Sequence, residues 1–330
     1  MINETFLYVS PKDSVCPYHN LAREEAFLQG LLPGQMILYL WQNKDTVVIG
    51  KNQNCFKECR VSLLEEEGGH LARRLSGGGA VFHDLGNLNY TFLAMKEDFD
   101  IARQTGIILE AVRSFGIPAG ATGRNDIEVN GRKFSGNAYY RTKGACYQHG
   151  TLLVSVDETK IDRYLNVDRE KLHSKGVDSV RSRVIGLSEL SDEISVESLK
   201  ERIAETFRKA FPQAGFQVLQ DEPEETKKLA EKYSSSDWLY GNRFDYSYQI
   251  ERKFPWGKTE MHFSVIKGII EQAALFTDAL ETTFPEQITQ ALEGKRFTPE
   301  AVREALFPFA ADESTGEIVL DIINWIEESM

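Results

Sequence analysis

The sequence predicts an α/β protein with a mixed α/β domain over residues 1–250 and a small α+β domain over residues 251–330. Three observations lead to this prediction. The length of 330 residues is about twice that of a typical domain. Short apolar runs alternate with amphipathic patterns of helical period through the first 250 residues. Near residue 250 this order gives way to two new strand-like runs that precede helical segments.

The elements expected in the first domain are strands over 5–9, 36–41 and 46–49, and helices over 18–30, 100–116 and 195–211. Gly30 is a helix stop, and Ser195 is a helix N-cap residue. Residues 43–45, Asn-Lys-Asp, suit a turn between the second and third strands.

In the second domain, Pro255 and Gly257 flank Trp256, and we interpret residues 254–258 as a hinge before a new strand. The expected elements are strands over 260–265 and 269–277 with a turn at 267–268, then helices over 281–293, 298–306 and 317–330. Pro299 suits the first position of its helix, where its missing N–H costs nothing.

The composition, 42% hydrophobic and 27% charged, is typical of a globular protein with a sizeable core. The net charge of -12 argues against a general nucleic-acid binder, because phosphate contacts need a basic surface. No apolar run approaches the roughly 18 residues of a membrane span, and the first residues do not resemble a signal peptide. We therefore expect neither nucleic acid nor a membrane among the partners.

Four cysteines, Cys16, Cys55, Cys59 and Cys146, are few for this length. No histidine cluster accompanies Cys55 and Cys59 at a zinc-binding spacing. We expect reduced thiols in a cytoplasmic protein, with a disulfide in an exported protein as the alternative.

Three consecutive glycines, Gly77 to Gly79, follow two arginines, Arg73 and Arg74. Such a run suits a tight turn or a close approach of backbone to a ligand, and its N–H groups can bind an anion. It has neither the ending of a P-loop nor the spacing of a dinucleotide-binding fold. A flexible turn is the alternative. Because neighbours on a strand face opposite sides, only one of the two arginines should face a ligand.

Asn130-Gly131 between two short strands predicts a hairpin with a type I′ turn. A regular two-residue hairpin pairs Glu128 with Lys133 and Asp126 with Ser135, and sets all four side chains on one face. Two carboxylates beside a lysine could hold a metal ion next to a phosphate. A plain cross-strand ion pair between Glu128 and Lys133 is the alternative.

His149 precedes Gly150 at the start of an apolar run, and a structural histidine is the ordinary interpretation. Cys146 with His149 as its base is a less favoured alternative. Residues 171–184 form a basic, serine-rich and glycine-rich segment. The chain from 121 to 185 has 12 basic and 8 acidic residues, so positive charge is concentrated around these motifs. This favours a nucleotide site over a merely solvated loop.

Together these segments resemble the lipoate–protein ligase A family. The matching motifs are 73–87, 123–126, 132–136, 149–153, 171–176 and 179–184, in the order found in the family, and 256–258 with 276–280 resembles its C-terminal accessory domain. The resemblance implies a mixed-sheet α/β catalytic domain like that of biotin and lipoate ligases over 1–250, with a small α+β accessory domain over 251–330.

The resemblance also implies a reaction in two steps. Lipoate and ATP, with Mg²⁺ as cofactor, would give lipoyl-AMP, and the lipoyl group would pass to a specific lysine of a lipoyl domain. The expected partners are the lipoyl domains of 2-oxoacid dehydrogenase acyltransferase subunits and the glycine-cleavage H protein. The runner-up is an octanoyl or lipoyl transferase that uses a Cys146 thioester. A non-catalytic lipoate-binding module is the third interpretation.

The family match assigns Lys133 as the catalytic residue, in contact with both ATP and lipoate. The other residues expected to bind ATP are Arg74, Gly77, Gly78, Gly79, Ala80, Val81, Phe82 and Arg181. Val81 and His149 are expected to bind lipoate, and Val48 is a further apolar wall. Asp126 is expected to hold Mg²⁺.

Overall fold

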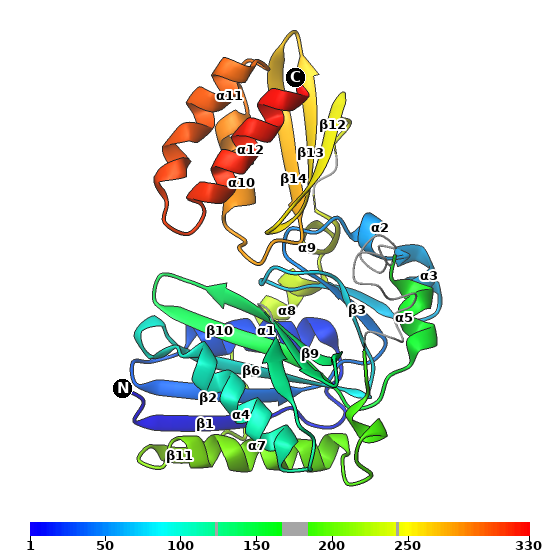
Figure 1. The fold of residues 1–330 in the computed structure, drawn as a ribbon, viewed down its shortest axis with the longest axis vertical. Coiled ribbons are helices and arrows are strands. Elements are labelled where there is room, and N and C mark those ends of the chain that lie inside the picture. Colours follow the sequence, from blue (N-terminus) through cyan, green and yellow to red (C-terminus); the bar gives the residue numbers. More distant parts are fainter. Residues whose placement is uncertain (123–124, 167–183, 242–243) are drawn as a thin grey trace. The chain divides into compact units, whose positions relative to one another are not determined.

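The computed structural model describes residues 1–122, 125–166, 184–241 and 244–330, which divide into two units (Figure 1). Unit 1 contains Met1–Val48, Phe56–Arg73 and Ala80–Leu239. Unit 2 contains Tyr240–Met330 together with two short segments from the first half of the sequence, Ile49–Cys55 and Arg74–Gly79. The glycine run therefore belongs with the C-terminal part of the chain.

Unit 1 is built on an eight-stranded sheet in the order β11-β1-β2-β6-β10-β9-β8-β7. β1 is parallel to β2 and β11, and the other pairs are antiparallel. The strands are β1 (Glu4–Val9), β2 (Gln35–Trp41), β6 (Asn87–Met95), β7 (Gly120–Thr122), β8 (Asp126–Val129), β9 (Arg132–Arg141), β10 (Ala145–Leu153) and β11 (Gly215–Val218). A smaller sheet has the order β4-β3-β5, from β3 (Thr46–Ile49), β4 (His70–Arg73) and β5 (Val81–His83). The predicted mixed sheet is confirmed.

The two faces of the large sheet differ in chemistry. Helices α4 (Ile101–Arg113) and α7 (Val196–Ala210) cover one face, where they form an apolar core with Leu88, Tyr90 and Phe92 of β6 (Figure 1). Side chains of opposite parity on the same strands, such as Thr91 and His149, point to the other face, which α1 (Pro17–Gln29) contacts. Thr91 and His149 thus lie on the face of the sheet that α1 contacts, away from this apolar core.

The helix starts follow the expected capping chemistry. The Asp100 carboxylate accepts a hydrogen bond from the Arg103 amide, and the Ser195 hydroxyl accepts one from the Ser198 amide. Up to residue 240, the other helices of the described residues are α2 (Cys55–Glu58), α3 (Val61–Glu66), α5 (Glu158–Tyr164), α8 (Thr226–Ser234) and α9 (Ser236–Tyr240), with short 3₁₀ turns at Lys96–Asp98 and Leu187–Glu189.

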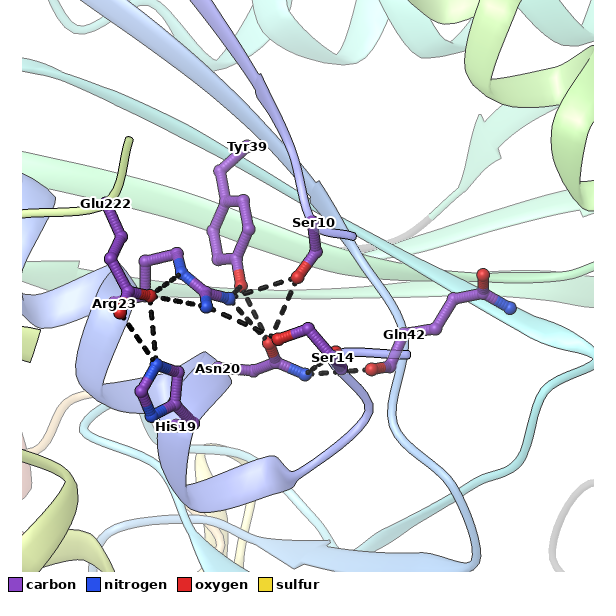
Figure 2. A network of polar contacts seen from close by, with 8 residues as sticks. All are labelled: Ser10, Ser14, His19, Asn20, Arg23, Tyr39, Gln42 and Glu222. Atoms are coloured by element: carbon purple, nitrogen blue, oxygen red, sulfur yellow. Dashed lines mark hydrogen bonds and ion pairs between the residues drawn. The ribbon is translucent and has the colours of Figure 1, made fainter. Parts of the chain in front are cut away.

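A buried polar network fixes α1 on the sheet (Figure 2). The Arg23 guanidinium donates to the Tyr39 hydroxyl at 2.9 Å and to the Asn20 side-chain oxygen at 2.8 Å. It also forms a 2.6 Å ion pair with Glu222, which His19 contacts at 2.9 Å. Figure 2 shows these side chains converging on Arg23 from α1, from β2 and from the segment after β11.

Unit 2 contains an antiparallel three-stranded sheet, β12 (Tyr248–Phe254), β13 (Gly257–Ile266) and β14 (Ile269–Thr277). Helices α10 (Phe284–Leu292), α11 (Pro299–Leu306) and α12 (Gly316–Ser329) pack on one face of it, and a 3₁₀ turn covers Phe307–Ala311 (Figure 1). The predicted small α+β domain is confirmed, as is the turn at 267–268.

The predicted hinge over 254–258 is wrong. Phe254 pairs with Gly257 at the closed end of a β-hairpin, so Pro255 and Trp256 are its loop. The Trp256 ring stacks on Phe254 at 4.6 Å, and its indole donates to Asp321 of α12. These contacts fix the segment inside the small domain.

None of the helices within the described ranges has the length and hydropathy needed to span a bilayer.

Candidate active site

The hairpin of β8 and β9 turns at Asn130-Gly131, whose φ values of 51° and 73° suit the predicted type I′ turn. Glu128 lies opposite Lys133, as expected. Beyond this pair β9 contains a bulge, so Asp126 lies opposite Gly136 and Ile127 opposite Ser135. The expected pairing of Asp126 with Ser135 is therefore wrong by one residue, and Ser135 is buried on the opposite face.

Lys133 is held by an ion pair on the accessible face of this hairpin. Its Nζ lies 2.7 Å from Oδ1 of Asp126, and the two side chains are 34% and 22% exposed. A Cβ on Gly136 would lie 2.8 Å from this Nζ. The lysine side chain therefore lies across Gly136, and the absence of a side chain there leaves the space that it occupies. Lys133 pairs with Asp126 in this structure, in place of the expected alternative, Glu128.

The main chain of Lys133 is also tied to the segment that follows the basic motif. The Ile185 amide donates to the Lys133 carbonyl at 3.0 Å, and the Arg132 guanidinium donates to the Val184 carbonyl at 3.0 Å. Arg181 and the rest of the motif up to residue 183 lie outside the described residues.

His149 lies on β10 in a buried polar chain. Its Nδ1 is 2.9 Å from Oε1 of Glu24, and the Thr91 hydroxyl donates to the same oxygen at 2.7 Å. The Trp41 indole donates in turn to Thr91 at 3.1 Å. Glu24 is only 2% exposed. Sequence reasoning missed it as a site residue, although an acidic residue on the apolar stripe of α1, three residues after Leu21, is a usable signal.

Cys146 is not arranged to use His149 as a base. β10 runs without interruption from Ala145 to Leu153, so residues 146 and 149 point to opposite faces of the sheet. Cys146 is buried, and burial raises the pKa of its thiol, which disfavours the thiolate. The geometry therefore counts against a thioester mechanism that uses this pair. The four cysteines, all within the described ranges, form no disulfide.

The glycine run, in unit 2, is a tightly packed turn. The Arg74 guanidinium donates to the carbonyls of Gly77 at 2.7 Å and Gly79 at 2.8 Å. Gly78 has a φ of 91°, and a Cβ on Gly77 would overlap the Ala279 carbonyl. Close backbone packing thus explains Gly77, the left-handed conformation explains Gly78, and the flexible turn is disfavoured.

Arg73, in unit 1, points to different partners from Arg74. Its guanidinium donates to the carbonyl oxygens of Trp238 and Leu239 at 2.8 and 2.7 Å. Adjacent arginines on this segment therefore have separate tasks, as strand alternation predicts.

Ala80, Val81 and Phe82 continue from the glycine run into β5. Val81 lies opposite Val48, which is buried, and the Phe82 ring lies 5.5 Å from that of Tyr164. Val48 and Val81 thus share one face of the smaller sheet, as walls of an apolar surface require.

Two family models match the chain. The lipoyl protein ligase A/B catalytic domain matches residues 16–208, and the bacterial lipoate protein ligase C-terminus matches residues 243–326. The chain is also 40% identical over 311 residues to the lipoate-protein ligase A of Bdellovibrio bacteriovorus, with 91% of each chain covered.

Solved structures of the same family resemble this fold. LipL1 of P. falciparum, in complex with lipoate, matches with a TM-score of 0.84 and 26% identity over 99% of both chains. A bi-partite lipoate protein ligase from Thermoplasma acidophilum, described with its E2 lipoyl domain, gives a TM-score of 0.62 at 27% identity, covering 74% of this chain and 99% of its own. A lipoate-protein ligase A bound with ATP gives 0.60 at 25% identity, covering 73% and 99%. On these matches the chain belongs to the lipoate–protein ligase A family and is a ligase.

Proposed function

We propose that this protein activates lipoate with ATP to form lipoyl-AMP and transfers the lipoyl group to a specific lysine of a lipoyl domain. The observation that carries the proposal is the ammonium of Lys133, which is accessible and fixed over Gly136 by Asp126. The relatives described with lipoate and with ATP support this choice of substrates.

In the first step, the lipoate carboxylate attacks the α-phosphorus of ATP and pyrophosphate leaves. Negative charge develops on the phosphoryl oxygens, and a fixed ammonium stabilises it. In the second step, the acceptor amine attacks the acyl carbonyl, loses a proton, and AMP leaves. The carbonyl oxygen gains negative charge, so the same Lys133 ammonium is useful again. Lys133 therefore acts as a charge and forms no covalent bond.

Asp126 is the residue that we propose for Mg²⁺, which would neutralise charge on the polyphosphate. Mg²⁺ often takes one or two carboxylates and completes its shell with water and phosphate oxygens. Asp126 fits this pattern, with Glu128 two residues away on the same strand face. Within the described ranges, no group of three or more metal-binding side chains stands ready without substrate.

The remaining site residues stay predictions from the family resemblance. Arg74 with the run from Gly77 to Phe82 is proposed for ATP, as is Arg181, and Val81 and His149 for lipoate. The buried chain from His149 to Glu24 supports the choice of His149, because it fixes the ring orientation. The division into a catalytic domain over 1–250 and an accessory domain over 251–330 is likewise a proposal.

Lipoyl domains of 2-oxoacid dehydrogenase acyltransferase subunits and the glycine-cleavage H protein are the proposed acceptors. The archaeal relative described with an E2 lipoyl domain supports the first of them. A cytoplasmic location stays a prediction.

Lipoate-dependent exchange of label between pyrophosphate and ATP tests the proposal directly. We expect exchange by the wild-type protein and its loss in Lys133→Ala. Absence of exchange by folded wild-type protein, with acyl transfer from a thioester, would favour the transferase. Lipoate binding with neither reaction would favour the binding module.

A further inference from the structure

The bulge in β9 determines which residue of β9 lies opposite Asp126 and beside the Lys133 side chain. In a regular ladder Asp126 would lie opposite Ser135, whose side chain would stand beside the path of the lysine. The observed register sets Gly136 there, and the Nζ of Lys133 occupies the space where a Cβ would be. The ion pair with Asp126 therefore depends on the extra residue in β9.

Asn137, the next residue, holds this register. Its main-chain amide donates to the Asn125 carbonyl at 2.7 Å, and its side-chain Nδ2 donates to the same oxygen at 3.2 Å. In return the Asn125 side chain donates to the Asn137 carbonyl at 3.1 Å. These bonds join the residue before Asp126 to the residue after Gly136.

The side-chain oxygen of Asn137 is held by hydrogen bonds as well. Its Oδ1 accepts hydrogen bonds from the Tyr90 hydroxyl and, at 3.1 Å, from Nε2 of Gln148. All three residues are buried, and Asn137 is 5% exposed. A Cβ on Gly150 would lie 2.8 Å from this Oδ1, so glycine leaves the space for the bond. Each end of the amide thus has its own partners.

We propose that Asn137 is a positioning residue for Lys133. Its side chain points toward α4, because Gln148 also donates to Thr105 of that helix, whereas Lys133 lies on the other face of β9. Asn137 therefore acts through the backbone: it keeps the bulged register, and the register keeps Gly136 beneath the ammonium. The proposal rests on the role of Lys133 in the proposed function.

A double-mutant cycle with Asp126 tests this. Asn137→Ala should lower kcat of lipoate-dependent exchange by about tenfold or more, since misplacing a catalytic group by ~1 Å can cost up to about 100-fold. KM for lipoate should change less. In an Asp126→Asn background the same substitution should add under about threefold, because coupled residues are non-additive. Asn20→Ala, a control that also removes a buried and hydrogen-bonded asparagine, should lower the melting temperature and leave kcat per folded protein unchanged.

A second readout does not depend on activity. In protein labelled at the lysine ε-carbons, the NMR signal assigned to Lys133 through Lys133→Arg should move in Asp126→Asn and in Asn137→Ala, and stay in Asn20→Ala. If Asn137→Ala does not fold, Asn125→Ala, which removes the 3.1 Å bond to the Asn137 carbonyl and keeps the Asn137 side chain, should move the same signal.

Two results would overturn the proposal: an unmoved Lys133 signal, or a loss of kcat by the full factor in both Asp126 backgrounds. A wild-type protein without exchange activity would contradict the proposed function, while the NMR comparison would still decide on positioning.

Discussion

Replacing Gly136 by alanine tests the arrangement of Lys133 without removing a charged group. The new Cβ would lie 2.8 Å from Nζ and 3.0 Å from Cε of Lys133, closer than carbon atoms tolerate. Gly136 is not among the residues with positive φ, so its backbone accepts alanine. The contacting atoms are the end of a flexible side chain, and we expect the lysine to move while the strand stays.

The size of the effect follows from these distances. Ordinary contact needs about 3.5 Å, so the ammonium must move by about 0.7 Å or more. A displacement of ~1 Å can cost up to about 100-fold in rate, or ~2.7 kcal/mol of barrier. The Lys133–Asp126 pair is partly exposed, and losing it should cost less than about 1 kcal/mol of stability. Activity should therefore fall far more than the melting temperature.

Gly120→Ala is the matched control. Gly120 lies on β7 of the same sheet, and a Cβ there would meet no atom of the described residues within 4 Å. Both variants should melt near the wild-type temperature, and only Gly136→Ala should lose lipoate-dependent exchange of label. If Gly136→Ala keeps its exchange rate within about threefold of Gly120→Ala, a difference of ~0.65 kcal/mol, then the path of Lys133 over Gly136 is not needed for catalysis.

Four further predictions follow from named contacts. Lys133→Ala should lower the exchange rate by about 100-fold or more, and a loss below about tenfold, ~1.4 kcal/mol, would remove its assigned role. Cys146→Ser should leave ligation nearly intact, and an acyl group trapped on Cys146 of the wild-type protein would speak for the transferase instead. Arg74→Ala should raise KM for ATP more than Arg73→Ala, because the Arg74 guanidinium hydrogen-bonds to the glycine run. Arg73→Ala should mainly lower the melting temperature. Equal changes in KM for the two variants would contradict this prediction. Burial opposes ionisation of Glu222, but hydrogen bonds from Arg23 and His19 outweigh this effect and lower its pKa. The ionised Glu222 therefore stabilises the folded protein above about pH 4.5, and this contribution is lost as pH falls. Melting curves of Glu222→Gln should therefore depend less on pH below about 4.5 than those of the wild-type protein, and identical pH dependence would count against the network.

Local signals predicted much of the fold correctly because their causes lie within a few residues. The I′ turn at Asn130-Gly131, the cap at Ser195 and the turn at 267–268 each follow from one or two side chains or a positive φ. The strand β12 was missed because its alternating pattern is carried by only a few apolar residues, and its formation depends on pairing with β13. Without that strand, the sequence pattern over 254–258 indicates a hinge.

The site could be predicted in part. Lys133 and Asp126 were expected on one face and lie in contact. Glu24 and Asn137 could not be found from local patterns, because their partners are remote: His149 is 125 residues from Glu24, and Tyr90 is 47 residues from Asn137. The packing of Gly77 against the Ala279 carbonyl is equally non-local, and three glycines in sequence do not reveal which backbone approaches them.

Two pairings of β9, one with β8 and one with β10, explain the bulge. They place odd-numbered residues of β9 on one face of the sheet near the turn, and even-numbered residues on that face farther along. The hairpin turn sets Lys133 opposite Glu128, on the face with Asp126. The ladder with β10 sets Ala138 opposite His149 and Tyr140 opposite Tyr147, on that same face. Residue 133 has an odd number, whereas residues 138 and 140 have even numbers. In a regular strand, odd-numbered and even-numbered residues point to opposite faces, so a regular strand cannot satisfy both pairings.

One extra residue of β9 between these two pairings resolves this conflict. Phe134 and Ser135 are both fully buried, and the alternation resumes with Gly136 on the face of Lys133 and Asn137 on the face of α4. The same insertion therefore turns Ser135 to the core face, leaves a glycine under the ammonium and directs Asn137 to Tyr90 and Gln148. Alternation counted from the turn alone fails at Ser135, whereas alternation counted from both ends of β9 requires the bulge.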